Sequence, residues 1–126
     1  MADETNEYFF EEGCYILELL NTPDDPHVSI ARARVPPGVT TRLHRLRGIV
    51  ERYVILSGSG RVEVGGQAPR EVAAGDTVTI PAMHSQRIAN SGEVDLVFLA
   101  VCTPRFTKDA YEDLESGQAL RGARFT

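Results

Sequence analysis

From residue 28 onward, short hydrophobic runs alternate with tight turns. Residues 28–35 place Ala31, Ala33 and Val35 on one face and Ile30, Arg32 and Arg34 on the other, which is the two-residue period of a strand with one buried face. Similar runs follow at 39–46, 52–56, 61–64, 70–72, 77–80, 86–89 and 94–102, with Gly or Pro in most of the intervening turns. Many short strands separated by such turns predict an all-β sandwich or barrel.

The two ends of the chain differ from this middle. Residues 8–20 are apolar enough to be ordered, and the Pro-containing segment 21–26 ends them as a turn. A helical period occurs only at 108–114, which predicts a short C-terminal helix, and beyond Gly117 we expect a tail that is loose or docked on a partner. We therefore expect one domain, made of an N-terminal strand or arm (1–27), a barrel (28–102) and a C-terminal helix and tail (103–126).

Composition narrows the class of protein. The 126 residues are 42% hydrophobic and 25% charged, which is typical of one soluble globular domain. The net charge of −5 argues against a nucleic-acid or membrane partner, because both recruit clustered Lys and Arg. The acidic N-terminus does not resemble a signal peptide, and two cysteines, Cys14 and Cys102, fit a reducing compartment. We expect a cytoplasmic protein.

The spacing of particular glycines with a histidine and a glutamate resembles a known family. Five residues separate Gly38 from His44, and six separate Glu51 from Gly58, as in the first motif of the cupin superfamily. Gly75, Pro81 and Asn90 are similarly spaced to the second cupin motif. The resemblance covers most of the middle of the chain. It implies the cupin double-stranded β-helix, which is a jelly-roll barrel.

Two positions depart from the cupin pattern. Cupins typically hold a divalent metal with three histidines and one glutamate, but Leu46 and Gln86 occupy two of the histidine positions here. The resemblance leaves His44, Glu51 and Gln86 as candidate ligands for Fe, Mn, Ni or Zn. Such a set would bind the ion more weakly than three imidazoles would.

Strand geometry suggests which other side chains share the site. Alternate residues of a strand face the same side, so Arg42 and Leu46 accompany His44, and Tyr53 accompanies Glu51 on the next strand. His44 and Glu51 are candidate catalytic groups, with Tyr53 as an acid or orienting donor.

Four residues are candidates for contact with substrate: Arg42, Leu46, His84 and Cys102. His84 precedes Gln86 by two residues, and a tight loop would let it replace a missing nitrogen ligand. Each candidate also has an ordinary structural interpretation: Tyr53 and Cys102 as core, Arg42 as a solvated strand charge, and His84 as a loop residue.

Three functional hypotheses remain open. The first is a metal-dependent enzyme acting on a small organic substrate, of the dioxygenase, isomerase or lyase type. The second is a metal-free acid/base enzyme or small-molecule-binding cupin, which the apolar Leu46 favours. The third is a non-catalytic interaction module. We expect a homodimer under all three, because cupins commonly pair through sheet edges that need covering.

Overall fold

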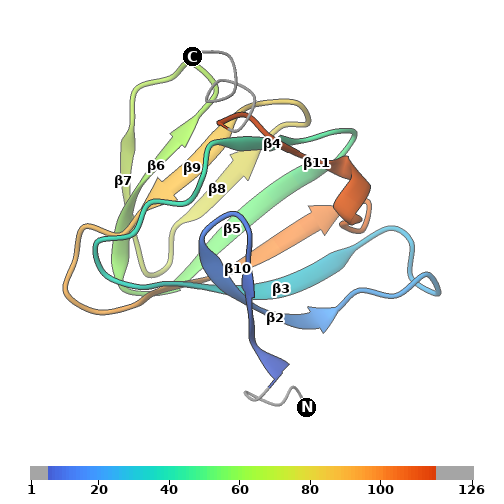
Figure 1. Cartoon of the computed structure of the whole chain (residues 1–126), viewed down its shortest axis with the longest axis horizontal. Helices are drawn as coiled ribbons and strands as arrows, with labels where there is room; N and C mark the ends of the chain where they lie inside the picture. Colours follow the sequence, from blue (N-terminus) through green and yellow to red (C-terminus); the bar gives the residue numbers. More distant parts are fainter. Residues whose placement is uncertain (1–5, 116–126) are drawn as a thin grey trace.

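The computed structural model describes residues 6–115 and consists of two antiparallel sheets that face each other as a barrel (Figure 1). The six-stranded sheet has the order β1 (Tyr8–Phe10), β2 (Cys14–Leu20), β3 (Ser29–Val35), β10 (Leu96–Thr103), β5 (Val50–Ser57) and β8 (Thr77–Ile80). The five-stranded sheet has the order β11 (Tyr111–Asp113), β4 (His44–Leu46), β9 (Gln86–Ala89), β6 (Ser59–Val64) and β7 (Arg70–Ala73). The predicted all-β architecture is confirmed.

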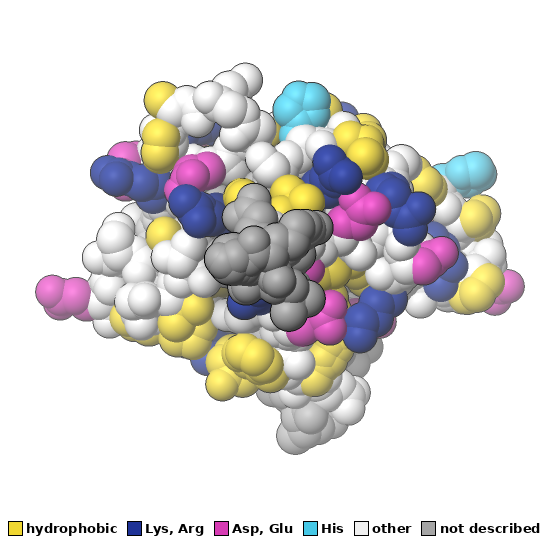
Figure 2. All heavy atoms as spheres, turned by 45° about the horizontal axis from the view of Figure 1, so that its top comes forward, with side chains coloured by type: hydrophobic (Ala, Val, Ile, Leu, Met, Phe, Trp, Pro, Cys, Tyr) yellow, Lys and Arg dark blue, Asp and Glu magenta, His cyan; other side chains and the backbone are white. Residues whose placement is uncertain are grey.

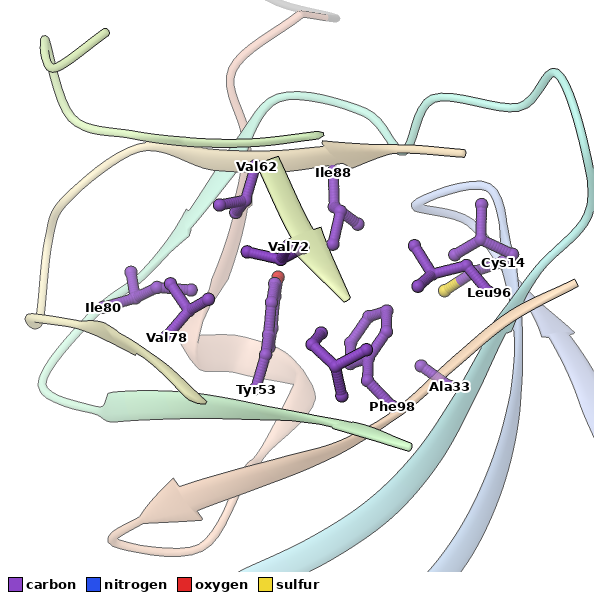
Figure 3. Packing of buried hydrophobic residues seen from close by; sticks show 12 residues of the cluster. Cys14, Ala33, Tyr53, Val62, Val72, Val78, Ile80, Ile88, Leu96 and Phe98 are labelled. Atoms are coloured by element: carbon purple, nitrogen blue, oxygen red, sulfur yellow. The ribbon is translucent and has the colours of Figure 1, made fainter. Parts of the chain in front are cut away.

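The main core lies between the sheets and receives side chains from both. Figure 3 shows Tyr53 and Phe98, from the six-stranded sheet, pointing towards Val62, Val72 and Ile88 of the opposite sheet. The rings of Tyr53 and Phe98 pack with centroids 4.4 Å apart. This burial supplies the main hydrophobic stabilisation of the barrel.

A second, smaller apolar cluster contains Leu46, Ile49, Cys102 and Ala110. Ile49, Glu51 and Tyr53 are alternate residues along β5 and the position before it, and all three are buried. Ile49 packs in this smaller cluster and Tyr53 in the main core, so Glu51 lies between the two. A carboxyl group thus sits in a largely apolar interior.

Two residues of the cupin-like spacing have structural roles. Gly58 has φ = 81°, and a Cβ at this position would lie 2.5 Å from the backbone oxygen of Asp95, so only glycine fits. Asn90 is buried, and its Nδ2 donates to the carbonyl oxygens of Val35 and Val94 at 2.8 Å each. These residues shape the scaffold rather than the chemistry.

The N-terminal arm is part of the sheet. Strands β1 and β2 form a hairpin, and β2 pairs with β3. Gly13, with φ = 102°, lies in the turn between them. Glu12 is part of the same turn, which therefore fixes its position.

The predicted C-terminal helix is only a single 3-10 turn, Lys108–Ala110, followed by strand β11. The prediction of a helix through residue 114 was therefore wrong. A helix this short is marginal in isolation, and Tyr111 to Asp113 instead pair with β4 of the barrel. The tail after Gly117 lies outside the described residues. Within residues 6–115 no helix has the length and hydropathy needed to cross a membrane.

Charged side chains on the surface are mostly close to charges of opposite sign. On the face shown in Figure 2, Lys and Arg side chains lie beside Asp and Glu side chains rather than in one basic patch. Arg45 and Glu112 approach to 2.6 Å, and Arg61 and Glu71 to 2.7 Å. This distribution agrees with the expectation of no nucleic-acid partner, which stays a prediction.

Candidate functional site

His44 is buried on β4, opposite Gln86 of β9. Its Nδ1 lies 2.6 Å from the carbonyl oxygen of Arg42. Because a carbonyl only accepts, Nδ1 carries a proton. The ring stacks on Tyr111 with centroids 5.0 Å apart. Backbone and stacking together fix the imidazole, with Nε2 left for other chemistry.

Glu12 meets this imidazole from the turn between β1 and β2. Its Oε1 lies 3.6 Å from Nε2 of His44, and the thiol of Cys14 lies 3.4 Å from its Oε2 as donor. Glu12 was not among the residues predicted from the sequence, because the pair Glu11-Glu12 has the pattern of ordinary surface charge. Only the hairpin turn brings it inward, and no local sequence signal indicates that.

Glu51 lies on β5 beside Cys102 of β10 and is only 9% exposed. Burial, and secondarily the charge of Glu12, raise the pKa of its carboxyl from 4.5 to about 8, although hydrogen bonds from Gln86 and Cys102 oppose the rise. Within the described residues its Oε1 has no hydrogen-bond partner. At neutral pH Glu51 is therefore mainly a protonated acid with unused hydrogen-bonding capacity.

Tyr53 and Gln86 form a buried pair. The hydroxyl of Tyr53 donates to Oε1 of Gln86. Burial, followed by the charge of Glu51, raises the pKa of Tyr53 well above its ordinary value, so the phenol keeps its proton. The amide oxygen that would ligate a metal is therefore already an acceptor.

The donor set, as it is arranged, fits a metal poorly. Nε2 of His44 faces the carboxylate of Glu12, the oxygen of Gln86 faces Tyr53, and Leu46 is apolar. In the part of the chain that the structure describes, no three His, Cys, Asp or Glu side chains are grouped to hold one ion.

The other predicted substrate residues divide into two groups. Leu46 and Cys102 are buried in the second apolar cluster. Arg42 instead turns to β11, where its Nε lies 3.0 Å from Oδ2 of Asp113, and its side chain is 38% exposed. His84 is exposed in the loop before β9 and lines a separate surface hollow with Pro81. The structure brings neither Arg42 nor His84 to Glu51.

His44 and Glu51 both point into the barrel, but they come from opposite sheets rather than from paired strands. Glu12 connects them, since it contacts His44 and its charge acts on Glu51. Gln86 in turn bonds to both Glu51 and Tyr53, so the four predicted residues lie in one buried set to which Glu12 adds a carboxylate.

A small cavity of about 60 Å³ opens beside Glu51, between the N-terminal arm and strands β3 and β10. Ala31 and Ala100, directly paired across β3 and β10, line it, and their short side chains leave the space. The lining residues are Tyr8, Phe10, Glu12, Ile16, Glu18, Leu20, Asn21, Ser29, Ile30, Ala31, Glu51, Ala100, Cys102 and Phe106. The size suits a small ligand or a few water molecules.

Comparison with known proteins supports the fold and the family. The model of the Cupin domain matches residues 31–102. An uncharacterized protein of Methanocaldococcus jannaschii is 35% identical over 115 residues, or 90% of this chain and 91% of the relative. An oxalate-binding protein of Thermotoga maritima is 39% identical over 71 residues, or 56% of this chain and 58% of the relative.

Oxalate decarboxylase from Bacillus subtilis has a similar fold, with a TM-score of 0.77 at 21% identity; the match covers 96% of this chain but 35% of that one. Glu12 lies outside the segment matched by the family model, so the arm adds a residue to the site that the matched segment lacks. The expected jelly-roll barrel is confirmed, and the chain belongs to the cupin family.

Proposed function

We propose that this cupin binds a small organic molecule in the cavity beside Glu51 and acts on it by proton transfer, without requiring a metal. The observation that carries the proposal is the buried Glu51 carboxyl, which lines the cavity and leaves one oxygen without a partner in the described chain. An unsatisfied buried polar atom is expensive, so a ligand that bonds to it gains affinity from it.

The groups around the cavity suit acid/base work. Glu51 holds a proton at neutral pH because burial raises its pKa to about 8, so it serves as a general acid or hydrogen-bond donor. Glu12 lines the same cavity and contacts Nε2 of His44. The Glu12 carboxylate can take a proton released by a ligand, and passing it to the imidazole requires Nε2 to move from 3.6 Å to hydrogen-bonding distance.

The relatives give independent support at the level of ligand size. The Thermotoga maritima relative is an oxalate-binding protein, and oxalate is comparable in size to what a 60 Å³ cavity admits. A shared barrel does not transfer the ligand itself.

Filling the cavity tests the proposal. Ala100→Leu adds three carbons to the cavity wall, and Val101→Leu adds one on the opposite face of the same strand as a control. We expect ligand-observed NMR on EDTA-treated protein to detect small polar fragments binding to the wild type and to Val101→Leu, but not to Ala100→Leu. Unchanged NMR spectra outside the cavity would show that Ala100→Leu folds, and Ala31→Val provides a milder second variant. Equal binding by all variants contradicts the proposal.

A metal-dependent enzyme is the second candidate. Nε2 of His44 and a carboxylate oxygen of Glu12 face each other at 3.6 Å. Either a proton or a metal cation between them would remove the repulsion between their lone pairs. With Gln86 turned away from Tyr53, His44, Glu51 and Gln86 would hold Fe, Mn, Ni or Zn, which would supply Lewis-acid chemistry. Stoichiometric metal in the purified protein that is lost in His44→Ala supports this candidate, and its absence after incubation with all four ions refutes it.

Two further expectations concern the whole protein. We expect a homodimer, because β1 and β8 end the six-stranded sheet and exposed edges attract pairing. We also expect a cytoplasmic location, since Cys14 and Cys102 are free thiols. Light scattering on the purified protein tests the first. If the chain is a dimer that binds no small molecule, the interaction-module hypothesis is favoured.

A further inference from the structure

We infer that the cavity selects a small organic cation, such as an alkylammonium, over a carboxylate of similar size. This inference rests on the proposed function and names the ligand class for the same cavity. It differs from what the name of the oxalate-binding relative suggests.

Negative charge reaches the cavity from two side chains, the carboxylates of Glu12 and Glu18, while Glu51 is mainly protonated at neutral pH. Glu12, Glu18 and Glu51 are lining residues, and no Lys, Arg or His is among the lining residues in the described chain. Glu12 is partly buried, so its charge is screened less by water than that of the exposed Glu18. A dicarboxylate would therefore meet repulsion with no compensating cation, whereas an ammonium group would meet attraction.

The unused oxygen of Glu51 is a second observation that points to a ligand. This side chain is more than nine-tenths buried and has no partner for Oε1 among the described residues. An ammonium N–H is a donor that a carboxylate ligand lacks. An ammonium ligand therefore donates to an oxygen of Glu51 whether or not that carboxyl is protonated, whereas a carboxylate ligand can bond to it only by accepting the Glu51 proton.

Aromatic rings at the same cavity favour the alkyl part of such a ligand. Tyr8, Phe10 and Phe106 line it, and Phe10 packs edge-to-face on Phe106 with centroids 6.2 Å apart. The hydroxyl of Tyr8 donates to Oε2 of Glu18 at 3.3 Å, which holds a carboxylate beside an aromatic ring. Rings next to carboxylates are the usual means of recognising organic ammonium groups.

Among the described residues, two basic side chains lie behind lining residues without lining the cavity themselves: His44, whose Nε2 is 3.6 Å from Oε1 of Glu12, and Arg105 beside Asn21. Nε of Arg105 donates to Oδ1 of Asn21 at 2.9 Å, so its guanidinium lies behind a lining residue and is already hydrogen-bonded. Arg105 does not itself line the cavity. It therefore does not reverse the preference set by the carboxylates of Glu12 and Glu18.

The test compares propylammonium, 1-propanol and acetate, three probes with the same number of non-hydrogen atoms, on EDTA-treated protein at constant ionic strength. Binding is followed by the amide NMR shifts of Ala31 and Ala100. We expect propylammonium to bind about tenfold more tightly than acetate. Glu18→Gln and Glu12→Gln should each reduce this preference severalfold. Glu71→Gln, a surface control whose side chain is 65% exposed, should leave it unchanged.

The possible results separate the two proposals. If acetate or 1-propanol binds in the cavity as tightly as propylammonium, the inference about charge is overturned while the proposed function stands. If none of the three probes shifts the resonances of Ala31 and Ala100, both the inference and the proposed function fail. A preference that is the same in Glu12→Gln, Glu18→Gln and wild type also overturns the inference.

Discussion

Replacing Glu51 by glutamine should change how the stability of the protein depends on pH. The folded protein holds the Glu51 proton up to a pKa of about 8, whereas the ordinary carboxyl pKa is 4.5. Below pH 4.5 Glu51 is mostly protonated in both the folded and the unfolded protein, so its ionisation does not change the free energy of unfolding. As the pH rises towards 8, the unfolded chain gains the ionised form that the folded interior disfavours, and stability falls.

The two pKa values give the size of this loss. A raised carboxyl pKa destabilises the fold by about 1.4 kcal/mol for each pH unit between the two values. From 4.5 to about 8 the sum is roughly 5 kcal/mol, about half of which is reached by pH 6.5. Glu51→Gln has no ionisable group, so its free energy of unfolding should not carry this loss.

Urea unfolding at pH 5, 6, 7 and 8 measures the effect. The difference in unfolding free energy between Glu51→Gln and wild type should grow in favour of the variant across this range, by about 3 to 4 kcal/mol in total. Glu71→Gln removes an exposed carboxyl and serves as the control, with a difference that stays nearly constant. Parallel curves for Glu51→Gln and wild type would refute the assignment of a raised pKa to Glu51.

Other predictions concern the scaffold and the thiols. Asn90→Ala removes the donor to the buried carbonyl of Val35 and to the partly buried carbonyl of Val94, and it should lower the free energy of unfolding by about 1 to 3 kcal/mol. A loss below about 0.5 kcal/mol in urea unfolding contradicts the structural role of Asn90. In Gly58→Ala the new Cβ would lie 2.5 Å from a backbone oxygen, so the free energy of unfolding should fall by more than about 2 kcal/mol. In Gly66→Ala the new Cβ has nothing within 4 Å, so stability should change little. Equal losses in the two variants would contradict this prediction. Burial raises the pKa of the thiols of Cys14 and Cys102, so neither should react with a thiol reagent at pH 8 until the protein is unfolded in urea, and fast labelling of the native protein would show that they are accessible.

Much of the barrel was predictable because its strands carry their own pattern. The predicted runs 77–80 and 86–89 coincide with β8 and β9; the first alternates Thr with Val and Ile, and both are followed by a turn residue, Pro81 and Asn90. The strand expected over 39–46 is shorter, with β4 covering only His44–Leu46 and Thr40 making an isolated bridge to Ala89. The helix expected over 108–114 is only a 3-10 turn at Lys108–Ala110, because pairing of the following residues with β4 outweighs the local preference of a short segment.

The site was predictable only in part, for a different reason. Motif spacing identified His44, Glu51 and Gln86, which are buried together. It did not identify Glu12, whose position depends on the turn of a hairpin far from the motif. Nor did alternation predict that Arg42 faces outward, because this residue lies before β4 begins and pairs with Asp113 of β11. Contacts set by tertiary pairing leave no periodic signal in the sequence.

A crystal structure of EDTA-treated protein, grown with the fragment that gives the strongest NMR signal, tests the central claim most directly. Our account predicts the fragment in the cavity between β2, β3 and β10, in contact with Ala31 and Ala100 and within hydrogen-bonding distance of Glu51. A fragment bound only at the outer surface, with the cavity closed around Glu51, would contradict it.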